Sequence, residues 1–166
     1  MKFAIVSDSH DNLANIDKML DYLKQNQIKV MIHCGDVCAP AVLAAMAKKF
    51  QGNIHLVFGN VDTDQEELEK LPNDFKNIKI YGETGQTEID KKTIAWTHYP
   101  WQAQELAESG KYNLVFYGHD HQPWEKLVGQ TKMLNPGTLA GMFSKPTFAI
   151  YDTATDKAQL ILLEKI

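Results

Sequence analysis

Two histidines, His119 and His121, stand two residues apart directly after Gly118, where the apolar segment of residues 113–117 ends. Imidazole nitrogens at this spacing, in a loop after a predicted strand, are well suited to bind a metal ion. The same arrangement, an apolar segment that runs into a short polar loop, recurs at Asp8-Ser9-His10, Gly35-Asp36 and Gly59-Asn60. If these strand ends converge, they make a metal site.

The elements that must position these loops alternate between strands and helices in the first half of the chain. Short apolar runs predict strands at residues 2–6, 29–32 and 54–58. Helical spacing predicts one helix with Leu13, Ile16, Leu20 and Leu23 on its buried face, and a second that begins near Pro40 and carries Val42, Leu43, Met46 and Phe50. This alternation is typical of βαβ units, so we expect parallel pairing among the strands.

The second half of the chain has the pattern of hairpins. Strands are predicted at residues 78–81, 86–89, 93–97, 113–117, 126–128, 132–134, 148–150 and 159–163, with a polar turn at 90–92 and a helix at 102–108. We therefore expect a mixed α/β fold, with parallel pairing early and antiparallel pairing late. The length favours a single domain over residues 1–166.

All the polar clusters fall just after predicted strands, where open α/β sheets place their active crevice. Asp8 and His10 follow the first strand, Asp36 the second, Asn60 and Asp62 the third, His98 the strand of residues 93–97, and His119 and His121 the strand of 113–117. Carboxylate, imidazole and amide groups suit Mn²⁺, Zn²⁺ or Fe²⁺, whereas a thiolate-rich set would indicate structural zinc. Without Asp62, these residues make seven candidate ligands, which are too many for one tetrahedral ion. They suit two ions about 3.5 to 4 Å apart that share a carboxylate and activate a bridging water against a phosphoryl group.

Composition excludes several other functions. A formal net charge of −4 and a pI near 5.8 argue against an extended nucleic-acid surface, which needs a basic face. The longest apolar run, residues 41–47, is too short to cross a membrane, and residues 3–6 are too few for the apolar part of a signal peptide. Two cysteines, Cys34 and Cys38, without a secretion signal indicate reduced thiols, so a cytoplasmic protein is expected.

The order and spacing of the polar motifs resemble those of one family, the calcineurin-like metallophosphoesterases, over nearly the whole chain. The motifs are Asp8-x-His10, Gly35-Asp36, Gly59-Asn60-x-Asp62, Thr97-His98 and Gly118-His119-x-His121. The short length and the Asn135-Pro136-Gly137 turn are most similar to the small single-domain phosphodiesterases of bacteria and archaea. The resemblance implies two mixed sheets packed as a sandwich with flanking helices, in four layers α/β/β/α.

The resemblance also implies the roles of the site residues. Asp8, His10 and His121 would bind one ion, Asn60, His98 and His119 the other, and Asp36 would bridge them. The implied reaction is hydrolysis of a small phosphodiester by a bridging hydroxide, with Asn60, Asp62 and His98 as the catalytic residues. The implied cofactors are two Mn²⁺ ions, with Zn²⁺, Fe²⁺ or Ni²⁺ as alternatives, and the chain is compatible with a homo-oligomer. The function left open beside it is a non-catalytic scaffold, because the fold also resembles the metallophosphoesterase-like subunit of the retromer coat.

Two positions depart from the pattern of the family. Val61 stands where the most active relatives have a histidine that protonates the leaving group, and Tyr99 stands where relatives commonly have glycine. Tyr99, Trp101 and Trp124 follow motif loops, so they either form an aromatic rim that stacks on the substrate or pack beneath the loops.

Other titratable residues have alternative roles. Asp62 either orients a metal ligand from behind or caps a helix that begins near Asp64. His33 and His55 lie outside the motifs and are expected to be core or surface histidines rather than ligands. Cys34 and Cys38 have no second cysteine pair to complete a zinc site, so they are expected to be small buried apolar residues.

Overall fold

The protein contains two β-sheets, and the structure, a computed structural model, describes residues 1–166. The first sheet has the strand order β11-β10-β1-β2-β3-β4. Its strands are β1 (Lys2–Val6), β2 (Val30–His33), β3 (Asn53–Leu56), β4 (Ile78–Ile80), β10 (Thr147–Asp152) and β11 (Lys157–Leu162), and its helices are α1 (Leu13–Gln25), α2 (Pro40–Lys49) and α3 (Gln65–Asp74). Strands β1 to β4 pair in parallel, whereas β10 and β11 join antiparallel.

The second sheet has the order β5-β6-β7-β9-β8. Its elements are β5 (Thr84–Ile89), β6 (Lys92–Thr97), α4 (Pro100–Glu108), β7 (Leu114–Phe116), β8 (Trp124–Val128) and β9 (Thr131–Asn135), and the chain ends in a short 3₁₀ turn, Leu163–Lys165. β6, β7 and β9 pair in parallel, while β5 and β8 form antiparallel edges. None of the helices has both the length and the apolar character needed to cross a membrane.

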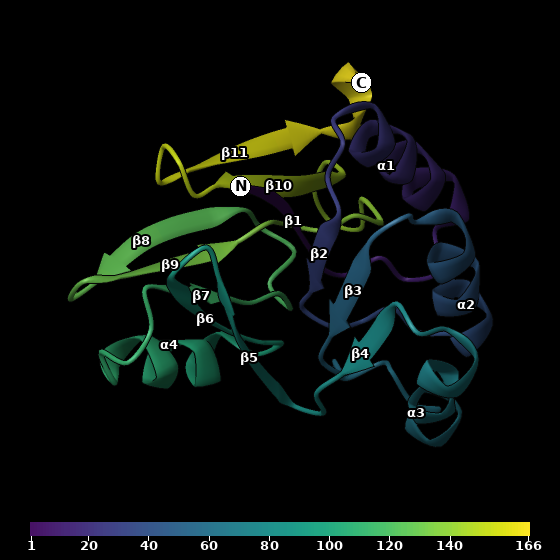
Figure 1. The fold of residues 1–166 in the computed structure, drawn as a ribbon, viewed down its shortest axis with the longest axis horizontal. Helices are drawn as coiled ribbons and strands as arrows, with labels where there is room; N and C mark the ends of the chain where they lie inside the picture. The colour runs from purple at the N-terminus through teal and green to yellow at the C-terminus, as the bar shows by residue number, and fades with distance from the viewer.

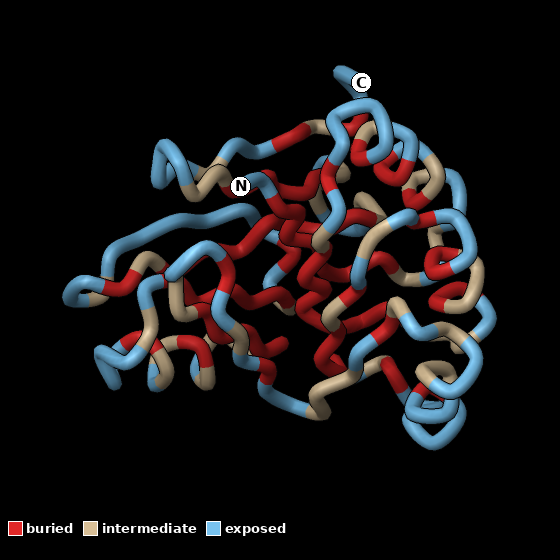
Figure 2. The backbone as a smooth tube through the Cα atoms, viewed as in Figure 1, coloured by how far each residue is buried: buried red, intermediate tan, exposed pale blue.

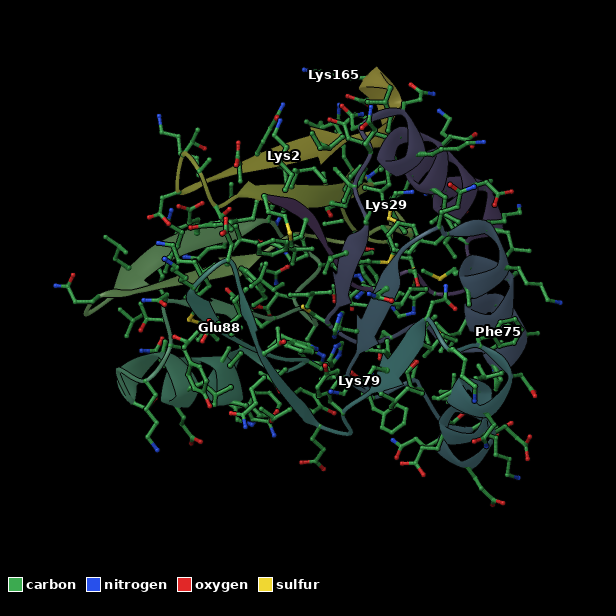
Figure 3. The ribbon with its side chains drawn as sticks, viewed as in Figure 1. Lys2, Lys29, Phe75, Lys79, Glu88 and Lys165 are labelled. Carbon is green, nitrogen blue, oxygen red and sulfur yellow. The ribbon has the colours of Figure 1, made fainter.

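Apolar side chains fill the spaces between four layers. Helices α1 to α3 cover the outer face of the first sheet, and α4 covers the outer face of the second (Figure 1). Between the sheets lie large buried rings, among them Phe3, Trp96, Phe116 and Tyr151. The buried stretches of backbone run through the middle of the molecule (Figure 2). Side chains occupy the space between the two sheets (Figure 3). The predicted α/β sandwich with flanking helices is therefore confirmed.

The pairing predicted for the second half was wrong at two places. The segment that contains β4 was expected to start a series of hairpins, but β4 pairs in parallel with β3 in the first sheet. Helix α3 connects these strands as a crossover, and Gly82, at a φ of 74°, lies where the chain leaves for the second sheet. Parallel pairing also returns late, because α4 forms a crossover from β6 to β7.

Candidate metal centre

The seven candidate ligands lie in loops that follow five strands of the two sheets. Asp8 and His10 follow β1, Asp36 follows β2, Asn60 follows β3, His98 follows β6, and His119 and His121 follow β7. Each loop leaves the carboxyl end of a strand that is parallel to its neighbour. The packing of the two sheets brings these ends together, so residues far apart in sequence meet in one cluster.

One group of side chains consists of Asp8, His10 and His121. The Asp8 Oδ1 atom lies 3.1 Å from His121 Nε2 and 3.8 Å from His10 Nε2. The two Nε2 atoms of His10 and His121 are 3.3 Å apart. Their potential ligand atoms all lie within 4.8 Å of one another, which is close enough to surround one ion.

A second group consists of Asn60, His98 and His119. The Asn60 Oδ1 atom is 3.0 Å from both His98 Nε2 and His119 Nδ1, and these two nitrogens are 3.3 Å apart. Asp36 lies between the groups, because its Oδ2 atom is 3.4 Å from His98 Nε2 and 3.7 Å from His10 Nε2. The structure thus brings all seven predicted residues together, with Asp36 in the shared position.

Hydrogen bonds to backbone carbonyls orient two of the imidazoles. His98 Nδ1 donates to the carbonyl of Cys34 at 2.8 Å, and His121 Nδ1 donates to the carbonyl of Met142 at 3.2 Å. The Nε2 atom of each neutral ring then has no hydrogen, and its lone pair faces carboxylate or amide oxygens. His121 Nε2 lies 3.1 Å from Asp8 Oδ1, and His98 Nε2 lies 3.0 Å from Asn60 Oδ1. Lone pairs that face each other at these distances repel, so a proton or a cation must lie between them.

The Asp8 carboxylate provides independent support for cation binding. Its Oδ1 atom is buried and accepts no hydrogen bond, whereas Oδ2 accepts the backbone N–H of His119 at 3.1 Å. Leaving a charged oxygen buried without a partner is unfavourable, and such exceptions are rare. Together with the facing imidazole lone pairs, this orphaned oxygen fits a site for divalent cations bound by nitrogen and oxygen.

The pKa values of these groups reflect their close coupling. Burial raises the pKa of Asp8, but the close imidazoles of His10 and His121 outweigh burial and hold that pKa well below its ordinary value. The adjacent Asp8 carboxylate raises the pKa of His121. Burial opposes charge on His98, yet the neighbouring Asp36 carboxylate raises the pKa of His98 as well. The carboxylates therefore stay ionised and make the site attractive to cations.

The loops that carry the ligands have unusual backbone conformations. Positive φ angles occur at Asp8 (52°), His10 (39°), Asp36 (58°), His119 (72°) and His121 (56°). Each such residue costs roughly 1 to 3 kcal/mol of backbone strain, and strain of this kind is concentrated at functional sites. Glycine allows the close approach of neighbouring loops, because a Cβ on Gly59 would lie 2.0 Å from Asp36 Oδ1.

Asp62 holds two of these loops together. Its buried carboxylate accepts backbone N–H groups from Asp36 at 2.8 Å and from Cys38 and Gly59 at 2.7 Å. Burial raises the pKa of Asp62 against the effect of these three bonds. Of the two predicted alternatives, the structure favours orientation of the Asp36 loop, because the side-chain hydrogen bonds of Asp62 go to the loops and not to helix α3.

His33, predicted to lie outside the ligand set, is buried and links the first two loops. Its Nδ1 atom accepts the N–H of Gly35 at 3.2 Å, so its Nε2 atom donates to Ser9 Oγ at 3.1 Å. Burial lowers the pKa of His33 to about 4, so the ring is neutral at physiological pH. Sequence reasoning missed this link, although a polar residue at the end of a buried strand, two residues before Gly35, was its signal. His55 lies elsewhere and contacts the Tyr81 hydroxyl at 2.7 Å.

The cysteines are free thiols, and neither belongs to a group of metal-binding side chains. Cys34 is buried as predicted, and burial raises the pKa of its thiol well above the ordinary value. Cys38 was also expected to be buried, but it is only partly covered and its Sγ atom lies 3.6 Å from His10 Nδ1. The difference arises because Cys38 belongs to the loop that Asp62 holds, not to strand β2.

Only part of the predicted aromatic rim lies at the site. The rings of Tyr99 and Trp101 stack with centroids 4.3 Å apart, and both meet His119 edge-on. Trp124, at the start of β8, instead lines a surface cavity with Leu134 and Leu160. Sequence reasoning missed Phe143, whose ring centroid is 5.4 Å from that of His121. No regular spacing marked this residue, because it belongs to an irregular loop.

Comparison with known proteins identifies the family. Residues 1–156 match the calcineurin-like phosphoesterase superfamily domain. A phosphodiesterase from Methanocaldococcus jannaschii is 32% identical over 167 residues, which cover 99% of this chain and 100% of the relative. The structure of an archaeal phosphodiesterase is similar at a TM-score of 0.89 and 30% identity, covering 98% of this chain and 99% of that chain.

A more distant structure has the same fold. Zinc-bound Vps29 from Entamoeba histolytica is similar at a TM-score of 0.68 and 18% identity, covering 98% of this chain and 99% of that chain. At this identity the likeness concerns the fold alone. The family match over most of the chain, and a relative of the same length, lead to a plain conclusion: this protein belongs to the calcineurin-like phosphoesterase superfamily.

Proposed function

We propose that the protein is a phosphodiesterase that hydrolyses small diesters with two divalent cations. The observation that carries this proposal is the orphaned Asp8 Oδ1 atom, which faces imidazole nitrogens whose lone pairs point at the same space. The archaeal relatives, which are named phosphodiesterases, support the diester as the substrate. Hydrolysis adds water across one ester P–O bond, and the alcohol leaves with a proton.

The distances support one assignment of the ligands. Asp8, His10 and His121 would hold one cation, Asn60, His98 and His119 the other, and Asp36 would be shared. Bound there, the cations would supply positive charge to phosphoryl oxygens and lower the pKa of a water between them. Asn60 and His98 act as ligands next to the substrate. Asp62 is a positioning residue rather than a catalytic one, since its carboxylate is taken up by three backbone N–H groups.

The side chains around the site favour diesters over monoesters. A monoester dianion is usually clamped by arginine, and this chain contains none. Lys145, in the loop that bears Phe143, is paired with Glu164 at 2.6 Å. The oxygen and nitrogen ligands favour Mn²⁺, with Zn²⁺, Fe²⁺ or Ni²⁺ as alternatives. The free thiols of Cys34 and Cys38 support a location of the protein in the reducing cytoplasm.

A metal and substrate assay tests this proposal. Protein purified without chelator is analysed for bound metals, stripped with EDTA, and reloaded with Mn²⁺, Zn²⁺, Fe²⁺ or Ni²⁺ in turn. We expect the reloaded protein to cleave bis(p-nitrophenyl) phosphate with a higher kcat/KM than p-nitrophenyl phosphate. Full turnover by the stripped protein would refute metal dependence, and a tenfold preference for the monoester would refute the substrate class. Failure of the metal-loaded protein to cleave either ester would favour the scaffold function instead.

A further inference from the structure

Aromatic side chains stand at both ends of the metal centre, outside the ligands. Tyr99 and Trp101 form a stack beside His119, with their rings inclined by only 20°. Phe143 lies beside His121, which belongs to the other group of ligands. Each of the two proposed cation positions therefore has its own aromatic neighbour.

The exposure of Phe143 is unusual for an aromatic side chain. The residue is 92% exposed and has a φ of 62°, in the left-handed region that bulky residues rarely adopt. Both the exposed ring and the backbone strain are unfavourable in the isolated protein. The loop is nevertheless fixed, because His121 Nδ1 donates to the Met142 carbonyl and Ser144 Oγ donates to the His121 carbonyl. These two bonds hold the residues on either side of Phe143 next to a ligand histidine.

The Tyr99–Trp101 stack is also preorganised and partly open. Pro100 begins helix α4, and Trp101 is the next residue, so both aromatic residues stand where the chain enters the helix. Tyr99 packs edge-on against His98 and His119, with centroids 5.1 Å apart in each case, whereas Trp101 is 55% exposed. The stack can therefore offer ring surface to a bound group without rearrangement.

We infer that the preferred substrates are phosphodiester monoanions in which both ester groups carry a flat unsaturated ring, as in aryl esters or in nucleoside esters with their bases. One ester group packs against the Tyr99–Trp101 stack and the other against Phe143, while the phosphate lies at the centre between them. This inference rests on the proposed phosphodiesterase function and specifies its substrate. Flat rings gain stacking energy on aromatic side chains that alkyl groups of similar size do not gain.

The first test keeps the leaving group constant and varies only the retained ester group. Methyl, cyclohexyl and phenyl p-nitrophenyl phosphates are compared by kcat/KM with the Mn²⁺-loaded protein. We expect phenyl to exceed methyl by about tenfold, the size of one aromatic contact, and cyclohexyl to stay near methyl. Equal values for phenyl and cyclohexyl would show that the site selects bulk rather than flatness, and would overturn the inference.

Alanine variants show which aromatic side chain contacts which ester group. We expect one of the variants Trp101→Ala and Phe143→Ala to abolish the preference for phenyl, because it removes the contact with the retained ester group. The other variant should lower kcat/KM about equally for all three diesters, because it removes the contact with their common p-nitrophenyl group. Trp124→Ala is the matched control, because this exposed tryptophan lines a different cavity, and it should change no value by more than about twofold. If both Trp101→Ala and Phe143→Ala also stay within twofold, the aromatic contacts do not exist.

A binding measurement separates this inference from the proposed reaction. Diphenylphosphinate shares the central PO₂⁻ group of a diester and carries two rings, but the rings are attached by P–C bonds, so it has no ester bond to hydrolyse; dimethylphosphinate lacks the rings. Calorimetry on the Mn²⁺-loaded protein should give at least tenfold tighter binding of the diphenyl anion, and each alanine variant should lose most of that difference. This result would support the recognition of flat groups even if no diester were cleaved. Equal affinity for the two anions would overturn it even if cleavage were efficient.

Discussion

The first sheet supplies all three carboxylates of the site, and the second supplies three of its four imidazoles. The loops after β1, β2 and β3 supply the carboxylates Asp8, Asp36 and Asp62, all of which are almost completely buried. The loops after β6 and β7 supply three imidazoles, and next to them stands the exposed ring of Trp101. We call the first group the acidic half and the second the aromatic half. The comparison indicates that the acidic half buries its charge in a hydrogen-bonded network, whereas the aromatic half carries the exposed ring that we propose to contact the substrate.

The largest effect is expected from a change in the acidic half. Asp36→Asn removes the charge that both groups of ligands share, so it should weaken both cation positions together. We expect kcat/KM for bis(p-nitrophenyl) phosphate to fall by about 10³-fold or more, with loss of bound metal by elemental analysis. His10→Ala is the matched control, because it removes a ligand from only one cation position, so its loss of kcat/KM and of bound metal should be smaller. Equal losses for the two variants would argue against a shared carboxylate.

Val61→His introduces an imidazole into the acidic half and so tests whether that half lacks an acid. The backbone N–H of Val61 donates to Asp36 Oδ1 at 3.0 Å, so the new ring starts close to the centre. A general acid helps most when the leaving group is a poor one, so alkyl diesters should gain about 10²-fold while p-nitrophenyl diesters change little. The measurement is the dependence of kcat/KM on leaving-group pKa, with metal content checked in both proteins. If the dependence is already shallow in the native protein, another residue acts as the acid, and Tyr99→Phe is the next variant.

Asp62→Ala tests the rigidity of the acidic half without removing a ligand. Three N–H groups, two of them in fully buried hydrogen bonds, would lose their acceptor, so we expect the free energy of unfolding to fall by about 2 to 4 kcal/mol. Metal affinity should fall by about 10- to 100-fold through the displaced Asp36 loop. Urea unfolding and metal titration measure the two effects. Asp64→Ala is the control, because Asp64 caps helix α3 without a side-chain hydrogen bond and is exposed.

The smallest effect concerns the pH dependence of stability in metal-free protein. The pKa values of His98 and His121 are raised above their ordinary value of 6.5. Their stabilising contribution is therefore fully present below pH 6.5 and is lost as the pH rises through the higher folded pKa. Protons and metal ions compete for the same nitrogens, so the increase in Tm on adding Mn²⁺ should grow from pH 6 to pH 8. A Tm increase that shrinks over this range would contradict the proposed ligand set.

The positions of the seven clustered side chains could be predicted because their chemistry depends on strand ends. A polar residue two or three positions after a buried strand, such as Asp8 or Asp36, is placed by the strand itself, so the sequence pattern predicts the geometry. The role of Asp62 was left open for the opposite reason. Its carboxylate is recognised by backbone groups of residues 36 and 38, and the sequence does not reveal which loop will lie beside it.

The errors arose where long-range packing decides the structure. β4 is only three residues long, and its pairing depends on the crossover through α3 rather than on its own sequence. The place of Phe143 beside the site could not be predicted, because an exposed aromatic residue in a loop belongs to no periodic pattern. Only its distance to His121 in the folded protein indicates a role. Trp124 follows His121 closely in sequence, yet strand β8 carries it to another cavity.

The hydrogen bonds around Asp8 have a consequence for folding during synthesis. The Thr138 hydroxyl and the Ala140 N–H both donate to the Asp8 carbonyl, and β1 pairs with β10 near the end of the chain. A nascent chain that has emerged from the ribosome only as far as His121 therefore contains every ligand but lacks the segments that fix the first loop. Because domains emerge from their N-terminus first, metal capture should occur late, after most of the chain has left the ribosome.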